Sequence, residues 1–291
     1  MHAAGSVMSE AYLAYTLNNT TAKIGRQYIT TPLVAGSGSR MFKQSFEAFV
    51  LANTDIPNTT LVAAYVTKFQ GRTSSNSDAT DIGNAPDFQD YNDGAFTIYA
   101  KNTSVENLTL QAQYAQVKIE NADDQKIAYL EANYKLNPVT ISAQTIQSDN
   151  GAATASDGAL YGIKVAAKVG MASLMAAYTT TDDEADTISG IGAGADKSYT
   201  AAYMTGGGFS DNSDTDSWKL GASTKVAGFG LGLTHTNWDD KNSNTESDAT
   251  DFSVSYAYNK AASVTVKHAV FGGTYGETQD YRSRVYLSYK F

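Results

Sequence analysis

The chain has 291 residues, a net charge of −9 at pH 7, no cysteine and only 18% charged residues. The absence of cysteine excludes disulfides, thiol nucleophiles and cysteine-based zinc sites, and the acidic balance argues against nucleic acid as the main partner. No stretch approaches the roughly 18–20 uninterrupted apolar residues that a membrane-spanning helix needs.

Segments of roughly ten residues, in which apolar side chains alternate with polar or small ones, recur along the whole chain. Alternation with a period of two predicts β-strands with two different faces. Helix is a poor alternative, because the segments are rich in Thr, Val, Tyr and Gly and carry no sustained i, i+3, i+4 stripe. Examples of the apolar sets, in chain order, are Leu13, Tyr15 and Leu17; Phe96 and Ile98; Tyr161, Ile163 and Val165; Phe229, Leu231 and Leu233; Phe252, Val254 and Tyr256; and Val285, Leu287 and Tyr289.

Short and long connections take turns between these segments. Short ones include LNNTT, DIPNT and YNKAAS, and long ones include the acidic SNSDATDIGNAPDFQDYNDG and NWDDKNSNTESDATD. A transmembrane β-barrel has tight periplasmic turns and long external loops, whereas a soluble sandwich has no reason to put every long loop at one end. We therefore predict an all-β fold: a transmembrane antiparallel up-and-down β-barrel that forms a single domain over residues 1–291.

The number of strands bears on whether the barrel is complete. We count about fifteen spanning segments, with Thr179–Ser217 taken as one large external loop. Bacterial single-chain barrels have an even number of strands, and the first segment, SEAYLAYTLNN, runs into a short turn and so starts on the external side. The start MHAAGSVMSE also lacks the features of a signal peptide. This parity predicts that an odd number of strands is missing from the front, together with the signal peptide.

The C-terminus, YRSRVYLSYKF, is a strand with an apolar face that ends on Phe291. Tyr289 and Phe291 resemble the C-terminal sorting signature of outer-membrane barrels, which implies the barrel assembly machinery as a partner. The predicted location is the bacterial outer membrane, with the long loops outside and with lipid and lipopolysaccharide as neighbours. The alternative is a strand of a soluble barrel that happens to end in phenylalanine.

Residues 20–72 resemble the OprD-type outer-membrane porins, also called carboxylate channels. Those proteins carry a Gly-basic/polar pair at a strand end, then Thr-Pro, Ser-Arg and a Phe-containing strand. Family members usually have Leu-Pro after Ser-Arg, where this chain has Met41, Phe42 and Lys43. The resemblance implies an eighteen-stranded barrel, of which these strands would be the last fifteen. The matching residues are Gly25, Arg26, Gln27, Thr31, Pro32, Ser39, Arg40, Phe46 and Phe49.

The resemblance also implies that the loop over about residues 29–45 folds inward and narrows the pore. Pro32 and the nearby glycines would permit a tight inward path. Pro32, Ser39, Arg40 and Lys43 are the candidate constriction residues, with Arg40 placed at the narrowest point.

The polar phase of the strands would face the lumen, because a Lys or Arg on the lipid face near the midplane costs about 2–4 kcal/mol. A row of cations along a pore offers serial weak sites to anionic groups, and the resemblance implies that such a basic track guides a carboxylate. Ordinary solvation of a polar lumen is the alternative. The candidate basic track consists of Lys101, Lys164, Lys168, Lys219, Lys267, Arg282 and Arg284, and the clearest lumen acid is Glu131.

Signals for enzymatic or metal chemistry are weak. His235 and His268 lie on different segments, and neither has a serine or aspartate at a spacing that would indicate a catalytic nucleophile–base pair or acid–His set. The run DNSDTDS lacks the glycine and the closing glutamate of a calcium loop. We therefore predict no enzyme activity, no metal site and no cofactor.

The predicted function is passive diffusion of small hydrophilic solutes. The resemblance adds a bias toward anionic or zwitterionic solutes that bear a carboxylate, such as amino acids, small peptides and organic acids. Two alternatives stay open: a non-selective general or structural porin, and a surface adhesin that uses the acidic loops. The oligomeric state would be a monomer or a homotrimer.

Overall fold

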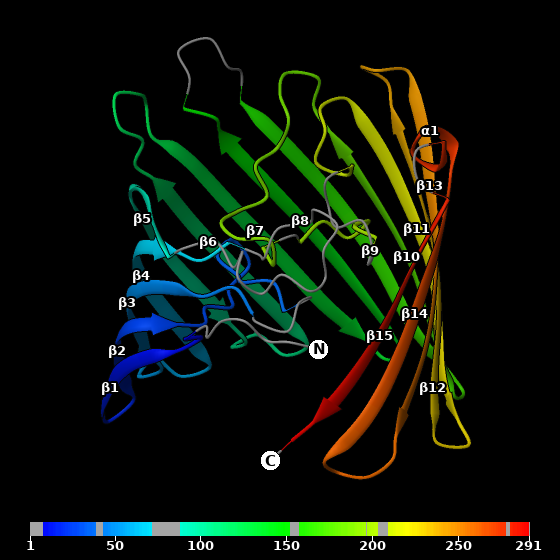
Figure 1. Ribbon diagram of the computed structural model, residues 1–291, viewed down its shortest axis with the longest axis horizontal. Helices are drawn as coiled ribbons and strands as arrows, with labels where there is room; N and C mark the ends of the chain where they lie inside the picture. Colours follow the sequence, from blue (N-terminus) through cyan, green and yellow to red (C-terminus); the bar gives the residue numbers. More distant parts are fainter. Residues whose placement is uncertain are drawn as a thin grey trace, which may run out of the picture. The chain divides into compact units, whose positions relative to one another are not determined.

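The computed structural model describes residues 8–38, 43–71, 88–151, 157–195, 197–202, 209–277 and 280–290. These residues form a 15-stranded sheet (Figure 1), which confirms the predicted all-β class and the count of about fifteen spanning segments. In the described ranges, no helix is both long enough and apolar enough to cross a bilayer.

The strands vary from seven to fourteen residues. The first eight are β1 Ala11–Leu17, β2 Thr20–Gln27, β3 Phe46–Asn53, β4 Thr59–Phe69, β5 Gln89–Asn102, β6 Leu108–Val117, β7 Gln125–Leu136 and β8 Val139–Asp149. The others are β9 Gly158–Val169, β10 Ala172–Thr181, β11 Thr215–Val226, β12 Phe229–Asp240, β13 Thr245–Ala257, β14 Ala262–Gly272 and β15 Tyr281–Tyr289, with the short helix α1 Gly273–Gly276 before β15.

The strand order follows the sequence from β1 to β15. Tight turns join many of the pairs: between β11 and β12 only Ala227 (φ 49°) and Gly228 (φ 83°) intervene, and Val226 pairs with Phe229. Positive φ at both central positions is the geometry of a two-residue hairpin that matches strand twist. The connection from Thr181 to Thr215 is much longer, in line with the predicted large loop.

The chain divides into two compact units. Unit 1 comprises Met1–Glu131, Ile146–Asp157 and Ile188–Lys197. Unit 2 comprises Ala132–Thr145, Gly158–Thr187 and Ser198–Phe291.

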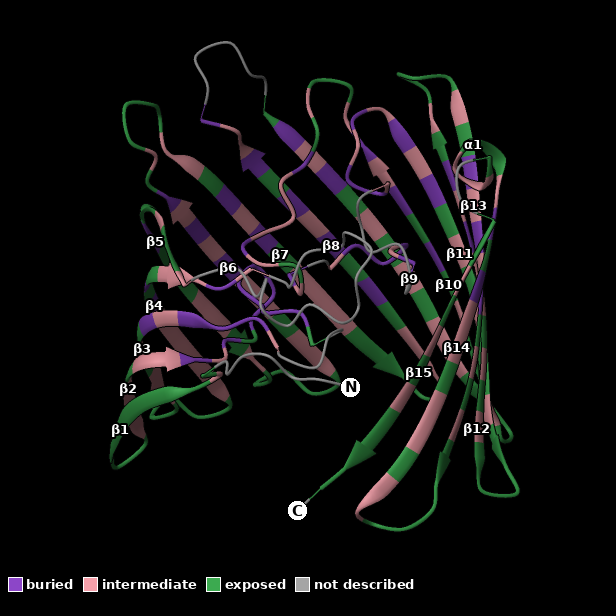
Figure 2. Ribbon diagram, viewed as in Figure 1, coloured by how far each residue is buried: buried purple, intermediate pink, exposed green. Residues whose placement is uncertain are grey.

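The strands have two chemically different faces, and exposure alternates along them (Figure 2). We call the face with the exposed apolar side chains the outer face and the opposite one the inner face. In unit 2, Leu231, Val254, Val266 and Val285 are paired in one row of the outer face across β12 to β15. Leu287 on the same face is 82% exposed. A contiguous apolar surface of this kind needs an apolar surrounding, and the alternation predicted from the sequence is confirmed.

Aromatic side chains lie on the outer face at both ends of the apolar band of unit 2. Tyr178 pairs with Trp218 at the end nearest the long connections. Phe229 pairs with Tyr256 at the end with the tight turns, where their ring centroids are 4.9 Å apart. Transmembrane barrels carry such aromatic girdles where lipid meets water.

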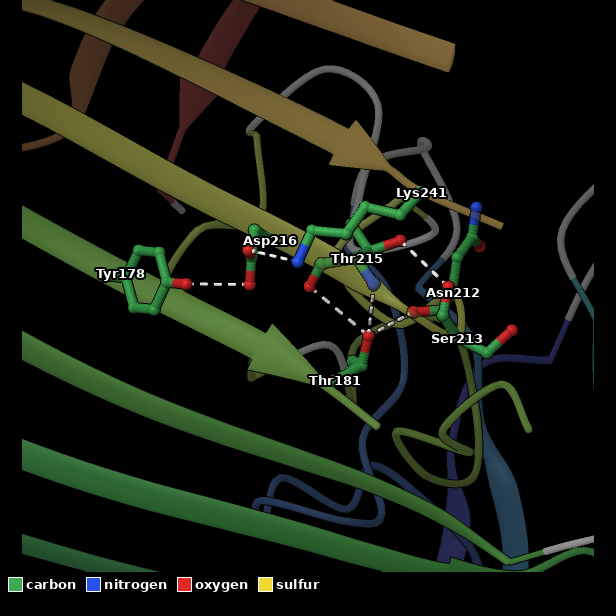
Figure 3. A network of polar contacts seen from close by, with 7 residues as sticks. All are labelled: Tyr178, Thr181, Asn212, Ser213, Thr215, Asp216 and Lys241. Carbon is green, nitrogen blue, oxygen red and sulfur yellow. Dashed lines mark hydrogen bonds and ion pairs between the residues drawn. The ribbon is translucent and has the colours of Figure 1, made fainter. Parts of the chain in front are cut away.

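A polar network begins where this band ends (Figure 3). The Tyr178 hydroxyl donates to Asp216 Oδ1 (2.7 Å), and Lys241 Nζ donates to Asp216 Oδ2 (2.6 Å). This hydrogen bond raises the pKa of the Lys241 ammonium group. Nearby, Thr181 Oγ1 donates to the Asn212 carbonyl (2.5 Å). The network ties the ends of β10 and β11 to the long connection between them and to the β12–β13 turn.

Candidate functional site

Part of the predicted constriction loop packs against the inner face of unit 1. We call residues 29–38 the first inner segment. Its residues Leu33 and Val34 are fully buried. The Leu33 amide donates to Gln113 Oε1 (2.8 Å), and Gln113 Nε2 donates to Thr31 Oγ1 (2.8 Å). Gln113 lies on the inner face of β6, so its two hydrogen bonds hold the first inner segment against the sheet, which we call the wall.

A second inner segment, residues 188–195, pairs with the first. Val34 and Ile191 form a parallel bridge. The Ile191 amide donates to the Leu33 carbonyl (2.7 Å), and the Ala35 amide donates to the Ile191 carbonyl (3.0 Å). Gly190 has φ 139°, and a Cβ there would lie 2.5 Å from the Leu33 carbonyl oxygen. This stretch belongs to the connection predicted as a large external loop, and its glycines allow the two backbones to approach closely.

One buried side chain joins both inner segments. Gln44 Oε1 accepts hydrogen bonds from the amides of Ser37 (2.9 Å) and Ala193 (3.0 Å). The backbone amide of Gln44 donates to the Ser37 carbonyl (3.1 Å). A buried amide oxygen with two donors is fully satisfied, so Gln44 stabilises the pairing of segments about 150 residues apart in sequence.

The predicted constriction residues have different positions. Pro32 is buried in the first inner segment. Lys43 is partly exposed, with its Nζ 3.4 Å from Thr30 Oγ1 and 5.0 Å from the centroid of the Tyr28 ring. Ser39 and Arg40 lie outside the described residues, so the place of Arg40 at a constriction stays a prediction.

Two lysines of the predicted basic track contact another chain segment in unit 2. Lys164 Nζ lies 3.9 Å from the centroid of the Tyr199 ring. Lys219 Nζ donates to the Ala201 carbonyl (2.5 Å). Both lysines are paired with Ala177, one from each side. A cation–π contact and a charge-assisted hydrogen bond therefore hold residues 198–202 against the wall.

The other cations of unit 2 extend along its inner face toward the C-terminus. Lys267 and Arg284 are directly opposite each other across β14 and β15. Arg282 Nη2 lies 3.3 Å from the Tyr275 hydroxyl. Lys168 is exposed near the β9–β10 turn. One row of the inner face runs from β9 to β15 through Lys168, Ser173, Ser223, Gly232, Ser253, Lys267 and Arg284.

A groove of about 430 Å³ opens on this inner face. Its charged lining residues are Lys219, Asp251 and Lys267, and Met175 supplies an apolar side chain. Four small residues of the row also line it, Ser173, Ser223, Gly232 and Ser253, together with larger apolar residues such as Leu174, Leu233 and Phe252. The groove thus has room for a small solute and is lined by both positively and negatively charged side chains.

Unit 1 holds Glu131 and Lys101. Gln111 Nε2 donates to the Glu131 carboxylate, and the Tyr99 hydroxyl donates to Gln111 Oε1 (2.6 Å). Lys101, near the end of β5, is exposed and pairs with Thr60 and Gln111. Glu131 is therefore part of a hydrogen-bonded chain of polar side chains in this unit.

The predicted C-terminal signature is described only in part. Tyr289 ends β15, is exposed on the outer face and pairs with Ala262. Phe291 lies outside the described residues. Across the described ranges, no group of three or more His, Cys, Asp or Glu side chains could hold a metal ion.

Asp251 and the second inner segment were not predicted from the sequence. Asp251 belongs to an acidic stretch assigned to a loop, although it shares the strand phase of Ser253 and Ser255 in DFSVSY. The alternating glycines of residues 190–194 were an available signal for close backbone approach. The contacts of Gln44 and Gln113 had no local signal.

Comparisons with known proteins fit this geometry. The model of the outer membrane porin, OprD family, matches residues 10–239. The solved structure of Pseudomonas aeruginosa OpdK is 16% identical, with a TM-score of 0.78, and the match covers 96% of this chain and 78% of that one. Acinetobacter baumannii OccAB1 is 19% identical, with a TM-score of 0.74 and coverage of 96% and 75%. Pseudomonas aeruginosa OccK8 (OprE) is 17% identical, with a TM-score of 0.72 and coverage of 96% and 78%.

A search of curated proteins finds no significant match. At identities of 15–19% the solved structures establish the fold, while the family match extends over most of the chain. The apolar outer face, its aromatic girdles and the cation-bearing inner face agree with both. The chain belongs to the OprD family of outer-membrane porins and is an integral outer-membrane protein with that family's antiparallel up-and-down β-barrel fold.

Proposed function

We propose that this porin favours small solutes that carry a carboxylate, and that Lys267 and Arg284 are the cations they meet on the inner face of unit 2. As an OprD-family porin, the chain sits among outer-membrane lipid and lipopolysaccharide and lets small solutes diffuse across. The observation that carries the carboxylate preference is that Lys267, which lines the groove, lies directly opposite Arg284 on the neighbouring strand.

Electrostatics explains why such a pair favours anions. Like charges directly opposite each other on neighbouring strands repel, and a bound anion relieves that repulsion. Binding must stay weak for the solute to leave again, which a pair of cations that both keep part of their surface exposed allows. Pseudomonas aeruginosa OpdK, which shares the fold at 16% identity, has been solved with vanillate, and vanillate carries a carboxylate.

The inner segments of unit 1 would supply the narrow part of the pore. Their support is the buried pairing of residues 29–38 with residues 188–195. Pro32, Ser39, Arg40 and Lys43 would belong to this constriction. The barrel assembly machinery would insert the protein into the outer membrane, where it would be a monomer or a homotrimer.

Ion currents through single channels test the carboxylate preference. We expect propionate to reduce the chloride current of the unaltered protein in a saturable way. In the double variant Lys267→Ala, Arg284→Ala, we expect the half-blocking propionate concentration to rise roughly ten-fold, because a hydrogen bond to a charged group is worth about 1.5–3 kcal/mol.

The matched control is Lys260→Ala. Lys260 lies in the exposed turn between β13 and β14, so its replacement removes one cation without touching the pair. The propionate block should stay unchanged in this control. A non-saturable propionate effect, or equal effects of all the variants, would instead support a general porin without preference.

A further inference from the structure

We propose that Arg26, on the outer face of unit 1 at the external end of β2, binds a phosphate group of lipopolysaccharide. Every integral protein of the outer membrane has this lipid as a neighbour, but the surroundings of Arg26 fit one defined contact with it. The site lies on the outer face, away from the groove and the inner segments, so it is independent of the proposed carboxylate preference.

Arg26 lies at the external edge of the apolar surface of unit 1. Ile24 pairs with Phe49, and Phe49 pairs with Tyr65, in one row of exposed side chains on the outer face. Arg26 follows Ile24 by two residues on the same face, which is roughly 7 Å along the strand. The phosphate groups of lipid A, the membrane anchor of lipopolysaccharide, lie just beyond its acyl chains. A cation in this position is therefore level with them.

The row of the outer face that contains Arg26 carries charges of alternating sign. Across β2 to β5, which lie side by side (Figure 1), its members are Arg26, Glu47, Lys68 and Asp90. Lys68 Nζ is 3.7 Å from Asp90 Oδ1, and Thr67 Oγ1 donates to Glu47 Oε1 (3.0 Å). Both hydrogen bonds described for the Arg26 side chain, in contrast, go to uncharged side chains.

Three neutral side chains hold the guanidinium group of Arg26. Its Nε donates to Ser45 Oγ (3.1 Å), its Nη2 donates to Gln70 Oε1, and its Cζ lies 4.2 Å from the centroid of the Phe88 ring. Ser45 and Gln70 are buried, while Arg26 keeps part of its surface exposed. A guanidinium group has more N–H donors than these two bonds use, and its planar fork matches two phosphate oxygens. The side chain is thus held in one orientation with donors left for an anion.

Charge balance explains why this anion would come from outside the chain. A partly buried charge is costly unless an opposite charge compensates it. Lys126, another cation at the external end of the outer face of unit 1, has such a partner, because its Nζ lies 3.0 Å from Asp149 Oδ2. Glu47 lies opposite Arg26 but accepts its hydrogen bond from Thr67. A phosphate of lipopolysaccharide would give Arg26 a counter-charge while the acyl chains cover the apolar row.

A simpler account is that Arg26 only braces the ends of β2, β3 and β4 through Ser45 and Gln70. The two accounts differ in what they expect from the lipid. A brace does not depend on whether the lipid carries phosphate, whereas a phosphate site does.

The test compares lipid A that carries its phosphate groups with the same lipid A after enzymatic removal of the phosphates. The purified protein in detergent micelles is titrated with each lipid, and native mass spectrometry gives the dissociation constant of the first bound lipid. We expect the unaltered protein to bind the phosphorylated lipid A about ten-fold more tightly. Inorganic phosphate at the same concentrations should not displace it, because it lacks the acyl chains that contact the apolar row.

Two variants remove the site in different ways. Arg26→Ala deletes the guanidinium group, and Gln70→Glu keeps an acceptor beside it but supplies a carboxylate as counter-charge. We expect each variant to raise the dissociation constant of phosphorylated lipid A about ten-fold. The matched controls are Lys126→Ala, which removes a cation that Asp149 already balances, and Gln147→Glu, which adds an acid at an exposed position near the external end of β8. Both controls should bind as the unaltered protein does.

Each contrary result has its own meaning. Equal binding of the two lipids by the unaltered protein would overturn the phosphate site even if a variant failed to fold. Equal losses in Arg26→Ala and Lys126→Ala would show that the cations of this face attract phosphate without a defined site. Displacement by inorganic phosphate would show a site for the free anion in place of the lipid. Unchanged binding in a folded Arg26→Ala variant would show that this arginine only braces the strand ends.

Discussion

Replacement of Val254 with lysine should lower the stability of the folded protein in a bilayer by about 2–4 kcal/mol. Val254 lies on the outer face of β13, is 44% exposed and is paired with Leu231 and Val266. Its row lies between the aromatic girdles, so a lysine there would meet hydrocarbon and not water. The cost is that of moving a charge into a medium that cannot solvate it.

Reversible denaturant unfolding from lipid vesicles measures this effect. The matched control is Ser255→Lys, which adds the same side chain one residue further along β13 but on the inner face. We expect Ser255→Lys to cost much less, because the inner face of a porin is solvated. Similar costs for the two variants would contradict the assignment of the outer face to lipid.

The two faces of the strands were predictable because strand alternation is local. In β15, Val285 and Leu287 lie on the outer face and Arg284 on the inner one, as expected from a period of two. The tight turns had local signals as well: Gly228, for example, permits the positive φ that its hairpin requires. The family resemblance around residues 20–72 agrees with the family match over residues 10–239.

Contacts between distant segments were not predictable in the same way. The sequence does not tell that Gln113 would bind Leu33, 80 residues away, or that Lys219 would bind the carbonyl of Ala201. The alternation of side chains predicted that Lys164 and Lys219 lie on the inner face, but alternation does not distinguish a lysine that meets solutes from one that binds another chain segment. The strand position of Asp251 was not predictable either, because the acidic residues before it favoured a loop over a strand.

The pairing of the two inner segments leads to a prediction about pore width. Replacement of Gly190 with valine should displace residues 188–195 from the first inner segment and raise the single-channel conductance. A Cβ at Gly190 would lie 2.5 Å from a backbone oxygen, that of Leu33, which cannot rotate away as a flexible side chain could. The φ of 139° adds strain of roughly 1–3 kcal/mol for a residue with a side chain. Both effects favour separation of the segments.

Gly38→Val is the matched control, because a Cβ at Gly38 would have no atom within 4 Å. It lies on the first inner segment, so it tests whether any valine there widens the pore.

A disulfide crosslink tests the pairing of the two inner segments directly. The chain has no cysteine of its own, so oxidation of the Val34→Cys, Ile191→Cys variant should join only the two bridged positions. The crosslinked protein should keep its original conductance. The same crosslink is then attempted in the Gly190→Val variant. If the conductance is unchanged and the crosslink still forms, the valine has not separated the segments. If the conductance is unchanged although the crosslink no longer forms, these segments do not set the width of the pore.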